Sequence, residues 1–139
     1  MKHQIILLGK DITSVYHGIK EFGPDHVHLL CTNETKEVAA PLFPLLPDGI
    51  RRTLYRTEPY DGEHVRNVCR KIHQTYPSAE FAYNLSEGTK VMAFAAFTIA
   101  KEYSVPAFYL SQLGELIRLD SFEKYPMQSQ LDNKEILGL

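Results

Sequence analysis

The sequence predicts a mostly parallel α/β sheet with helices on both faces and an antiparallel β-hairpin near its C-terminal end. Short apolar runs alternate with segments of helical periodicity over the first 110 residues. The 139 residues are 44% hydrophobic and 23% charged, as in an ordinary globular domain with its own core. Two final apolar runs are separated by residues 111–114, a polar turn that ends in glycine.

The first unit of the chain has the pattern of a strand, a turn and a helix. Residues 4–8 are an apolar run, and residues 12–22 repeat apolar side chains at helical spacing until a Gly-Pro pair stops the helix. Asp11 or Thr13 is well placed to cap this helix, and we expect that structural role for Asp11. A second, largely apolar strand is predicted over residues 26–31.

The middle of the chain contains a proline-rich segment and then another strand and helix. Residues 38–47 are apolar but carry three prolines, so they predict a loop or a short helix packed over the sheet, with a partner-binding surface as the alternative. A strand is predicted over residues 52–57. Asp61 should cap a helix that reaches Tyr76, and we expect its charged sides, including His73, to face solvent.

The central stretch combines a strand, a polar turn and a long helix. Residues 81–83 are apolar, residues 84–90 read Asn-Leu-Ser-Glu-Gly-Thr-Lys, and helical spacing then continues to Tyr103. Such a turn brings the free N–H groups of a helix N-terminus beside a glycine, two hydroxyls and a cation. This combination of groups is typical of a phosphate-binding site. Neither the P-loop spacing nor the dinucleotide fingerprint is present. The candidate ligand-binding residues of this turn are Asn84, Ser86, Gly88, Thr89 and Lys90.

An alternative for this central turn is purely structural. Ser86 or Thr89 would then simply cap the helix while Lys90 is solvated, since serine and threonine are ordinary caps.

The turn after the first strand supplies a second set of polar groups. In an open parallel sheet both turns lie at the carboxyl edge, where ligands bind. We therefore expect one ligand site formed by the two turns together. The candidates from the first turn are Gly9, Lys10, Asp11, Thr13 and Ser14.

The C-terminal part of the chain closes the predicted sheet. Residues 105–110 predict a fifth strand, and residues 115–119 can return as its antiparallel partner. We expect residues 1–120 to form one domain and residues 121–139 to be a loose tail or an arm that docks on a second subunit.

Composition excludes several classes of protein. A net charge of −2 and a pI near 6.3 argue against broad binding to duplex nucleic acid or to an anionic membrane. We see no signal peptide and no apolar run long enough to span a membrane, so we expect a cytoplasmic protein with reduced, buried thiols at Cys31 and Cys69. No cofactor is expected. His26 and His28 alternate on one strand face, but no third ligand lies nearby in sequence, so no metal site is predicted.

The turn at residues 84–90, between a strand and an alanine-rich helix, resembles that of CARF domains, the Rossmann-like sensor modules of type III CRISPR systems. The turn after the first strand and the closing hairpin add to the resemblance, which covers most of residues 3–120. The branch it looks closest to carries an Asn-x-Thr-Gly-Gly-Thr-Lys loop ahead of a restriction-like nuclease domain.

This resemblance implies a homodimer that binds a cyclic oligoadenylate, with two equivalent turns facing one ring. A two-fold dimer can match the rotational symmetry of such a ring. By resemblance, phosphate would be contacted by Ser86, Gly88, Thr89 and Lys90, and adenosine groups by Lys10, Thr13 and Ser14.

Glu87 departs from the pattern, because the branch usually has glycine there. Its carboxylate would repel a polyanion unless it points away, binds an adenine amino group or takes part in chemistry. The chain is also too short for a nuclease domain after the hairpin, so we expect a stand-alone domain.

A stand-alone sensor has no effector to switch, which favours a ring nuclease that degrades the signal. Attack of a ribose 2′-hydroxyl would leave a 2′,3′-cyclic phosphate without a metal. Lys90 and Ser86 would stabilise charge on the phosphate, Glu87 is a candidate base and His17 a weaker candidate acid. The alternatives are a non-catalytic cyclic oligoadenylate sensor or sponge, and a Rossmann-like domain that binds another nucleotide.

Overall fold

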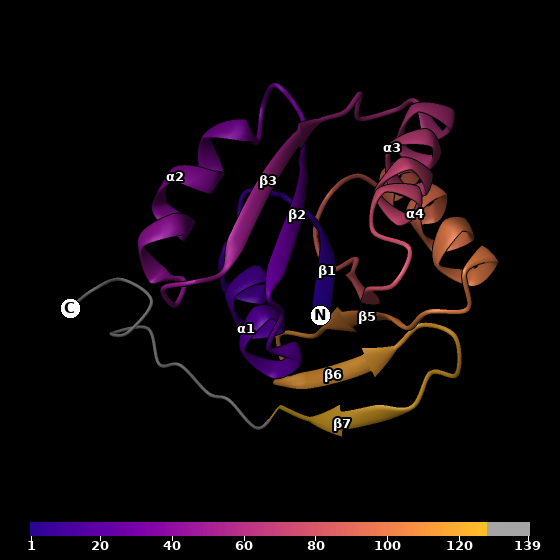
Figure 1. Cartoon of the computed structure of the whole chain (residues 1–139). Helices are drawn as coiled ribbons and strands as arrows, with labels where there is room; N and C mark the ends of the chain where they lie inside the picture. Colours follow the sequence, from indigo (N-terminus) through magenta and orange to yellow (C-terminus); the bar gives the residue numbers. More distant parts are fainter. Residues whose placement is uncertain (128–139) are drawn as a thin grey trace.

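The computed structural model describes residues 1–127, which form a seven-stranded sheet between two layers of helices (Figure 1). The strands are β1 (Lys2–Leu7), β2 (His26–Cys31), β3 (Arg51–Arg56), β4 (Glu80–Asn84), β5 (Ala107–Leu110), β6 (Glu115–Arg118) and β7 (Lys124–Pro126). Their order in the sheet is β3-β2-β1-β4-β5-β6-β7; the first five are parallel, and β6 and β7 are antiparallel to their neighbours. The predicted fold class is confirmed.

The helices cover both faces of the sheet. They are α1 (Thr13–Phe22), α2 (Ala39–Leu42) between two 3₁₀ turns (Lys36–Val38 and Phe43–Leu45), α3 (Gly62–Thr75) and α4 (Lys90–Glu102). Side chains alternate along β1, so Ile6 and Leu8 pack with the layer of α1 and α2, whereas Ile5 and Leu7 pack with α3 and α4. The chain therefore has a core on each side of one sheet.

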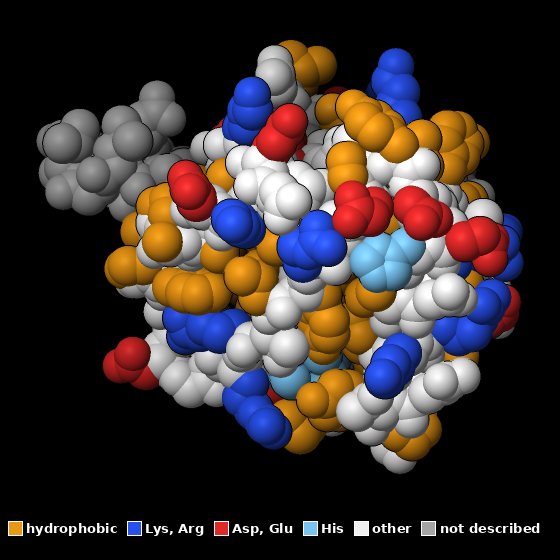
Figure 2. Space-filling view, turned by 90° about the horizontal axis from the view of Figure 1, so that it is seen from above, with side chains coloured by type: hydrophobic (Ala, Val, Ile, Leu, Met, Phe, Trp, Pro, Cys, Tyr) orange, Lys and Arg blue, Asp and Glu red, His pale blue; other side chains and the backbone are white. Residues whose placement is uncertain are grey.

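The carboxyl ends of the parallel strands lie at the upper edge in Figure 1, because β1 runs upward from the N-terminus. Figure 2 looks onto this edge from above. The opposite edge holds the amino ends of the same strands.

Two segments take more definite structure than expected. The proline-rich segment forms short helical turns whose Ala39, Leu42 and Leu46 are buried against the sheet, so it covers the core. Part of the expected tail, at 124–126, pairs with β6 as a further strand. Residues 128–139 of the expected tail or dimer arm lie outside the described residues.

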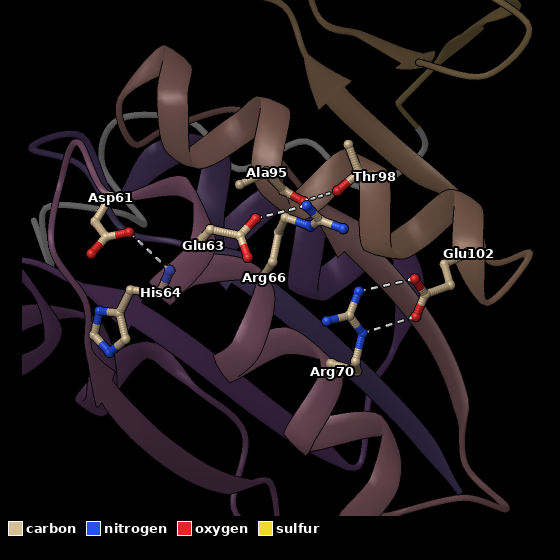
Figure 3. Close-up of polar contacts among 8 residues, drawn as sticks. All are labelled: Asp61, Glu63, His64, Arg66, Arg70, Ala95, Thr98 and Glu102. Carbon is tan, nitrogen blue, oxygen red and sulfur yellow. Dashed lines mark hydrogen bonds and ion pairs between the residues drawn. The ribbon is translucent and has the colours of Figure 1, made fainter.

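Helix α3 packs along α4, and polar contacts connect their exposed sides (Figure 3). Asp61 caps α3 as predicted, its carboxylate accepting the His64 N–H at 3.1 Å. The Arg70 guanidinium donates two hydrogen bonds of 3.0 Å to the Glu102 carboxylate, which joins the two helices. The solvated face predicted for α3 is therefore partly an inter-helix contact.

His73 is the clear exception to that predicted face. It is 5% exposed, its Nε2 lies 2.9 Å from the Tyr83 hydroxyl, and its ring stacks on Tyr103 at 4.0 Å. The prediction of a solvent-facing His73 is wrong because position 73 lies one helical turn after the buried Cys69 and shares its face. Burial lowers the pKa of His73 to about 4.

Helix α4 begins at a side-chain cap. The Thr89 hydroxyl accepts the Met92 N–H at 3.1 Å and donates to the Pro59 carbonyl. At the start of α1 the N-cap position is Ile12, which has no side-chain cap, so the expectation that Asp11 or Thr13 is the cap is not met. The Asp11 carboxylate, one residue earlier, nevertheless accepts the Thr13 N–H at 2.9 Å. Cys31 and Cys69 are free and buried, as predicted. No helix within residues 1–127 combines the length and apolar character needed to cross a membrane.

Replacing Thr89 by valine should lower the free energy of unfolding by about 1–2 kcal/mol, because the cap and the bond to the Pro59 carbonyl are both lost while the side-chain shape is kept. Thr89→Ser retains the hydroxyl and should stay close to wild type. Urea unfolding followed by circular dichroism measures both variants, and equal stability of Thr89→Val and wild type would contradict the capping role.

Acid should destabilise the protein partly through His73. The pKa of His73 is lower in the folded protein than in the unfolded chain, so the unfolded chain is protonated first as the pH falls. The stability that comes from the neutral ring is therefore present above pH 6.5 and is lost as the pH falls toward 4. Between pH 6.5 and 4.5, wild type should lose up to about 2 kcal/mol more unfolding free energy than His73→Gln. Urea titrations across this range provide the measurement; parallel pH profiles for the two proteins would contradict the assignment.

Candidate functional site

The site lies where the connections of two adjacent strands leave in opposite directions. β1 and β4 are neighbours in register, with Ile6 opposite Asn84. β1 leads to α1 on one face of the sheet, while β4 leads to α4 on the other. Such a switch point opens a crevice at the carboxyl edge, where open α/β sheets bind ligands. The two predicted turns are thus brought together.

The side chain of Asn84 holds the turn after β4 in place through hydrogen bonds. It is buried, donates to the Ser14 carbonyl at 3.2 Å, and accepts from the N–H and the hydroxyl of Ser86 at 3.1 and 2.6 Å. The Ser86 hydroxyl in turn accepts the Leu110 N–H at 2.9 Å. One amide thereby links β4 to α1 and, through Ser86, to β5. The hydrogen of the Ser86 hydroxyl is already donated within the protein.

The remainder of this turn leads into α4. Gly88 has a φ of +87°, and a Cβ there would lie 3.0 Å from the Leu7 Cβ, so the position requires glycine. The Thr89 hydroxyl is occupied as the helix cap, as the structural alternative proposed. Lys90 is the first residue of α4 and is exposed, and its side chain makes no hydrogen bond or ion pair within residues 1–127.

Glu87 lies between the two turns. One of its carboxylate oxygens is 3.4 Å from the Asp11 backbone nitrogen, and the backbone of Gly9 packs so closely that a Cβ there would collide with the Glu87 side chain. Burial raises the pKa of the Glu87 carboxyl; the Asp11 N–H partly opposes this shift, and the Asp11 carboxylate adds to it. Glu87 is therefore protonated more readily than an ordinary surface glutamate.

A cavity of about 300 Å³ opens on the α1 side of Glu87. The Ser14 hydroxyl oxygen and His17 Nδ1 are buried and have no hydrogen-bond partner in the described part of the chain. Unpaired buried polar atoms are costly, so they favour a ligand or water at this place. The residues lining this cavity include Thr13, Ser14, His17, Glu87, Tyr109 and Gln112.

Two further hollows also reach Glu87. One, of about 350 Å³, lies toward β2 and is lined by Lys10, Glu34, Tyr60 and Thr89 among others. The other, of about 480 Å³, is largely apolar and lies along α4, with Lys90, Phe94, Phe97 and Phe122 in its walls. The predicted residues thus surround Glu87, although Asn84, Ser86 and Thr89 use their side chains within the protein.

Sequence reasoning missed Tyr109 and Gln112 at the first cavity and Tyr60 at the second. A signal existed for the first two, because β5 is parallel to β4 and its carboxyl end must reach the same edge. Tyr60 lies in a connection whose path the sequence did not define.

The charge of this edge is mixed. Figure 2 shows lysine or arginine side chains beside aspartate or glutamate side chains, with hydrophobic side chains in several separate places on the same face. Lys10 and Lys90 are exposed on the turns after β1 and β4. The same two turns also carry the acidic residues Asp11 and Glu87, which are in contact with each other. An anionic ligand would meet cations and backbone N–H groups here, but not a uniformly basic surface.

Comparisons with known proteins give structural matches only. No family model and no curated protein sequence matches the chain. Can2 from Sulfobacillus thermosulfidooxidans, solved in complex with cyclic tetra-adenylate, matches 97% of the chain with a TM-score of 0.85 and 22% identity, over 40% of its own length. A type III CRISPR defence DNA nuclease activated by cyclic oligoadenylate matches 97% of the chain with a TM-score of 0.81 and 20% identity, over 22% of its own length.

A third solved structure, protein VC1899 from Vibrio cholerae, matches 99% of the chain with a TM-score of 0.81 and 14% identity, over 39% of its own length. The chain thus spans less than half the length of each of these three structures. Nearly the whole described fold is shared at low sequence identity. The chain therefore shares the Rossmann-like fold of these structures, in line with the fold that the resemblance at residues 84–90 led us to expect.

Proposed function

We propose that this chain binds a cyclic oligoadenylate in the crevice between the turns after β1 and β4. The observation that carries the proposal is the cavity beside Glu87, where Ser14 Oγ and His17 Nδ1 lack partners. The solved complex of Can2 with cyclic tetra-adenylate supports the ligand class, because that protein shares the fold. A nucleotide offers phosphates for the cations and sugar or base groups for the unpaired atoms.

The roles of the residues differ in part from those implied by the resemblance. Lys10 and Lys90 are exposed and free to pair with phosphate. The hydroxyls of Ser86 and Thr89 are engaged within the protein, so backbone N–H groups at the start of α4 take their place as phosphate donors. Thr13 and Ser14, at the first turn of α1, remain available for ribose or base.

We propose that two copies of the chain hold the ring between them. A ring is larger than one crevice, and a two-fold pair would present the same turns to both halves of it. Exposed apolar side chains beside the site support such a pairing, since Phe94 and Phe122 are each 74% exposed next to the apolar hollow.

Cleavage of the ring is a second candidate, favoured by the presence of Glu87 and His17 in one cavity. In this reaction the ribose 2′-oxygen bonds to phosphorus as its proton passes to Glu87, and the bond to the 5′-oxygen breaks as that oxygen takes a proton from His17. The products are a 2′,3′-cyclic phosphate and a 5′-hydroxyl. Lys90 would stabilise the charge that develops on the phosphate.

Binding can be tested with cyclic tri-, tetra- and hexa-adenylate by isothermal titration calorimetry. We expect one of these rings to bind, and Lys10→Ala and Lys90→Ala each to weaken it about tenfold or more through loss of a phosphate contact. Lys20→Ala and Lys101→Ala are matched controls, because they remove exposed lysines from the far ends of α1 and α4. Failure of every ring to bind, or equal losses in all four variants, would contradict the proposal.

Cleavage can be tested by incubating the bound ring in EDTA and separating the products by chromatography with mass detection. Glu87→Gln should bind the ring at least as tightly as wild type, because a negative charge near phosphate is removed, but should cleave it about 100-fold more slowly or worse. Intact ring after prolonged incubation with wild-type protein would leave a binding protein and exclude the nuclease.

A further inference from the structure

Three histidines meet at the amino edge of the sheet, the edge opposite the candidate ligand site. His3 on β1 pairs in register with His26 on β2, and His28 follows two residues later on the same face. All three are buried, with exposed fractions of 3%, 2% and 0%. This cluster plays no part in the function proposed above.

The three imidazole rings form a compact triangle. The ring centres of His26 and His28 are 4.1 Å apart, and the ring centre of His3 lies 4.9 Å from that of His26 and 5.1 Å from that of His28. One ring nitrogen from each residue lies within 4.8 Å of the other two. Tyr76 and Phe81 pack against the histidine rings and cover the cluster on the side of α3.

Neighbours on β3 determine which nitrogens remain available. His26 Nε2 lies 2.8 Å from the Thr53 hydroxyl, and His28 Nδ1 lies 2.8 Å from the Tyr55 hydroxyl. If each ring donates to its hydroxyl, the lone pairs of His26 Nδ1 and His28 Nε2 are left free. Hydrogen bonding of the outer nitrogen in this way is how metal-binding histidines are usually oriented.

The remaining nitrogens are poorly satisfied by protein alone. His28 Nε2 lies 2.9 Å from His3 Nδ1, so these two atoms share one hydrogen, and His26 Nδ1 has no partner among residues 1–127. A buried polar atom without a partner is costly. A cation that accepts one lone pair from each ring would satisfy all three.

We propose that His3, His26 and His28 bind one divalent transition-metal ion of the zinc class, which connects β1 to β2. Imidazole nitrogen suits this class of metal, with bonds of about 2.0–2.1 Å. His3 would move its ring proton to Nε2 so that Nδ1 can ligate. Tetrahedral spacing, with water as the fourth ligand, would require His3 Nδ1 and His28 Nε2 to separate slightly from their 2.9 Å contact and the His26 ring to adjust toward both. Because Tyr76 and Phe81 cover the cluster, the ion would have a structural role.

The test uses the full chain without an affinity tag, treated with EDTA and then titrated with Co²⁺ and with Zn²⁺. We expect one equivalent of Co²⁺ to give visible absorption of tetrahedral type, displaced by Zn²⁺, and Zn²⁺ in excess to raise the melting temperature by roughly 5 °C or more. Absence of stoichiometric binding by the folded wild-type protein would overturn the proposal.

Variants assign the ligands. His26→Gln and His28→Gln should each lose the Co²⁺ absorption, whereas His73→Gln, which changes a buried histidine outside the cluster, should keep it. Nitrogen-15 spectra of the histidine rings add a readout that does not depend on variant folding, because Zn²⁺ should shift the ring nitrogens of three histidines in wild type. Shifts confined to His17 and His64 would place the metal elsewhere and refute the site.

Discussion

The geometry of the candidate ligand site depends on the side-chain amide of Asn84. It holds the turn after β4 through Ser86, reaches α1 at the Ser14 carbonyl, and is connected through the Ser86 hydroxyl to β5. The close packing of Gly18 against this amide leaves no room for a larger residue on α1. Three neighbouring elements therefore keep fixed positions around the crevice, so its shape is set before a ligand arrives, and preorganisation of this kind favours affinity.

Glu87 is the feature that distinguishes this site from a simple phosphate-binding turn. A glycine would leave the crevice open and neutral, but here a half-buried carboxyl separates the space beside α1 from the space along α4. Its raised pKa and its contact with the Asp11 N–H lessen the repulsion of an anion. The same properties suit a group that accepts and returns a proton.

The two edges of the sheet have opposite characters because opposite ends of the strands carry different residues. The carboxyl edge ends in glycine-containing polar turns and stays open. The amino edge is closed by aromatic rings over His3, His26 and His28, which occupy positions where an apolar core would normally continue. The carboxyl edge therefore offers the open crevice that we propose for a ligand, whereas the amino edge is filled by side-chain contacts between neighbouring strands.

The sequence by itself determined the order of the first six strands and of the three long helices, the cap at Asp61, and the meeting of two polar turns at one edge, because periodicity and turn chemistry are local and parallel strands end together. Only the tertiary structure decided which polar atoms remain free. Ser86 and Thr89 look like ligand donors in sequence, but the Ser86 hydroxyl bonds to Asn84 and to the distant Leu110 N–H. The Thr89 hydroxyl donates to the carbonyl of Pro59, which is also distant in the chain. Likewise, His3 joins His26 and His28 only because β1 and β2 pair in this register, a contact that no local pattern encodes.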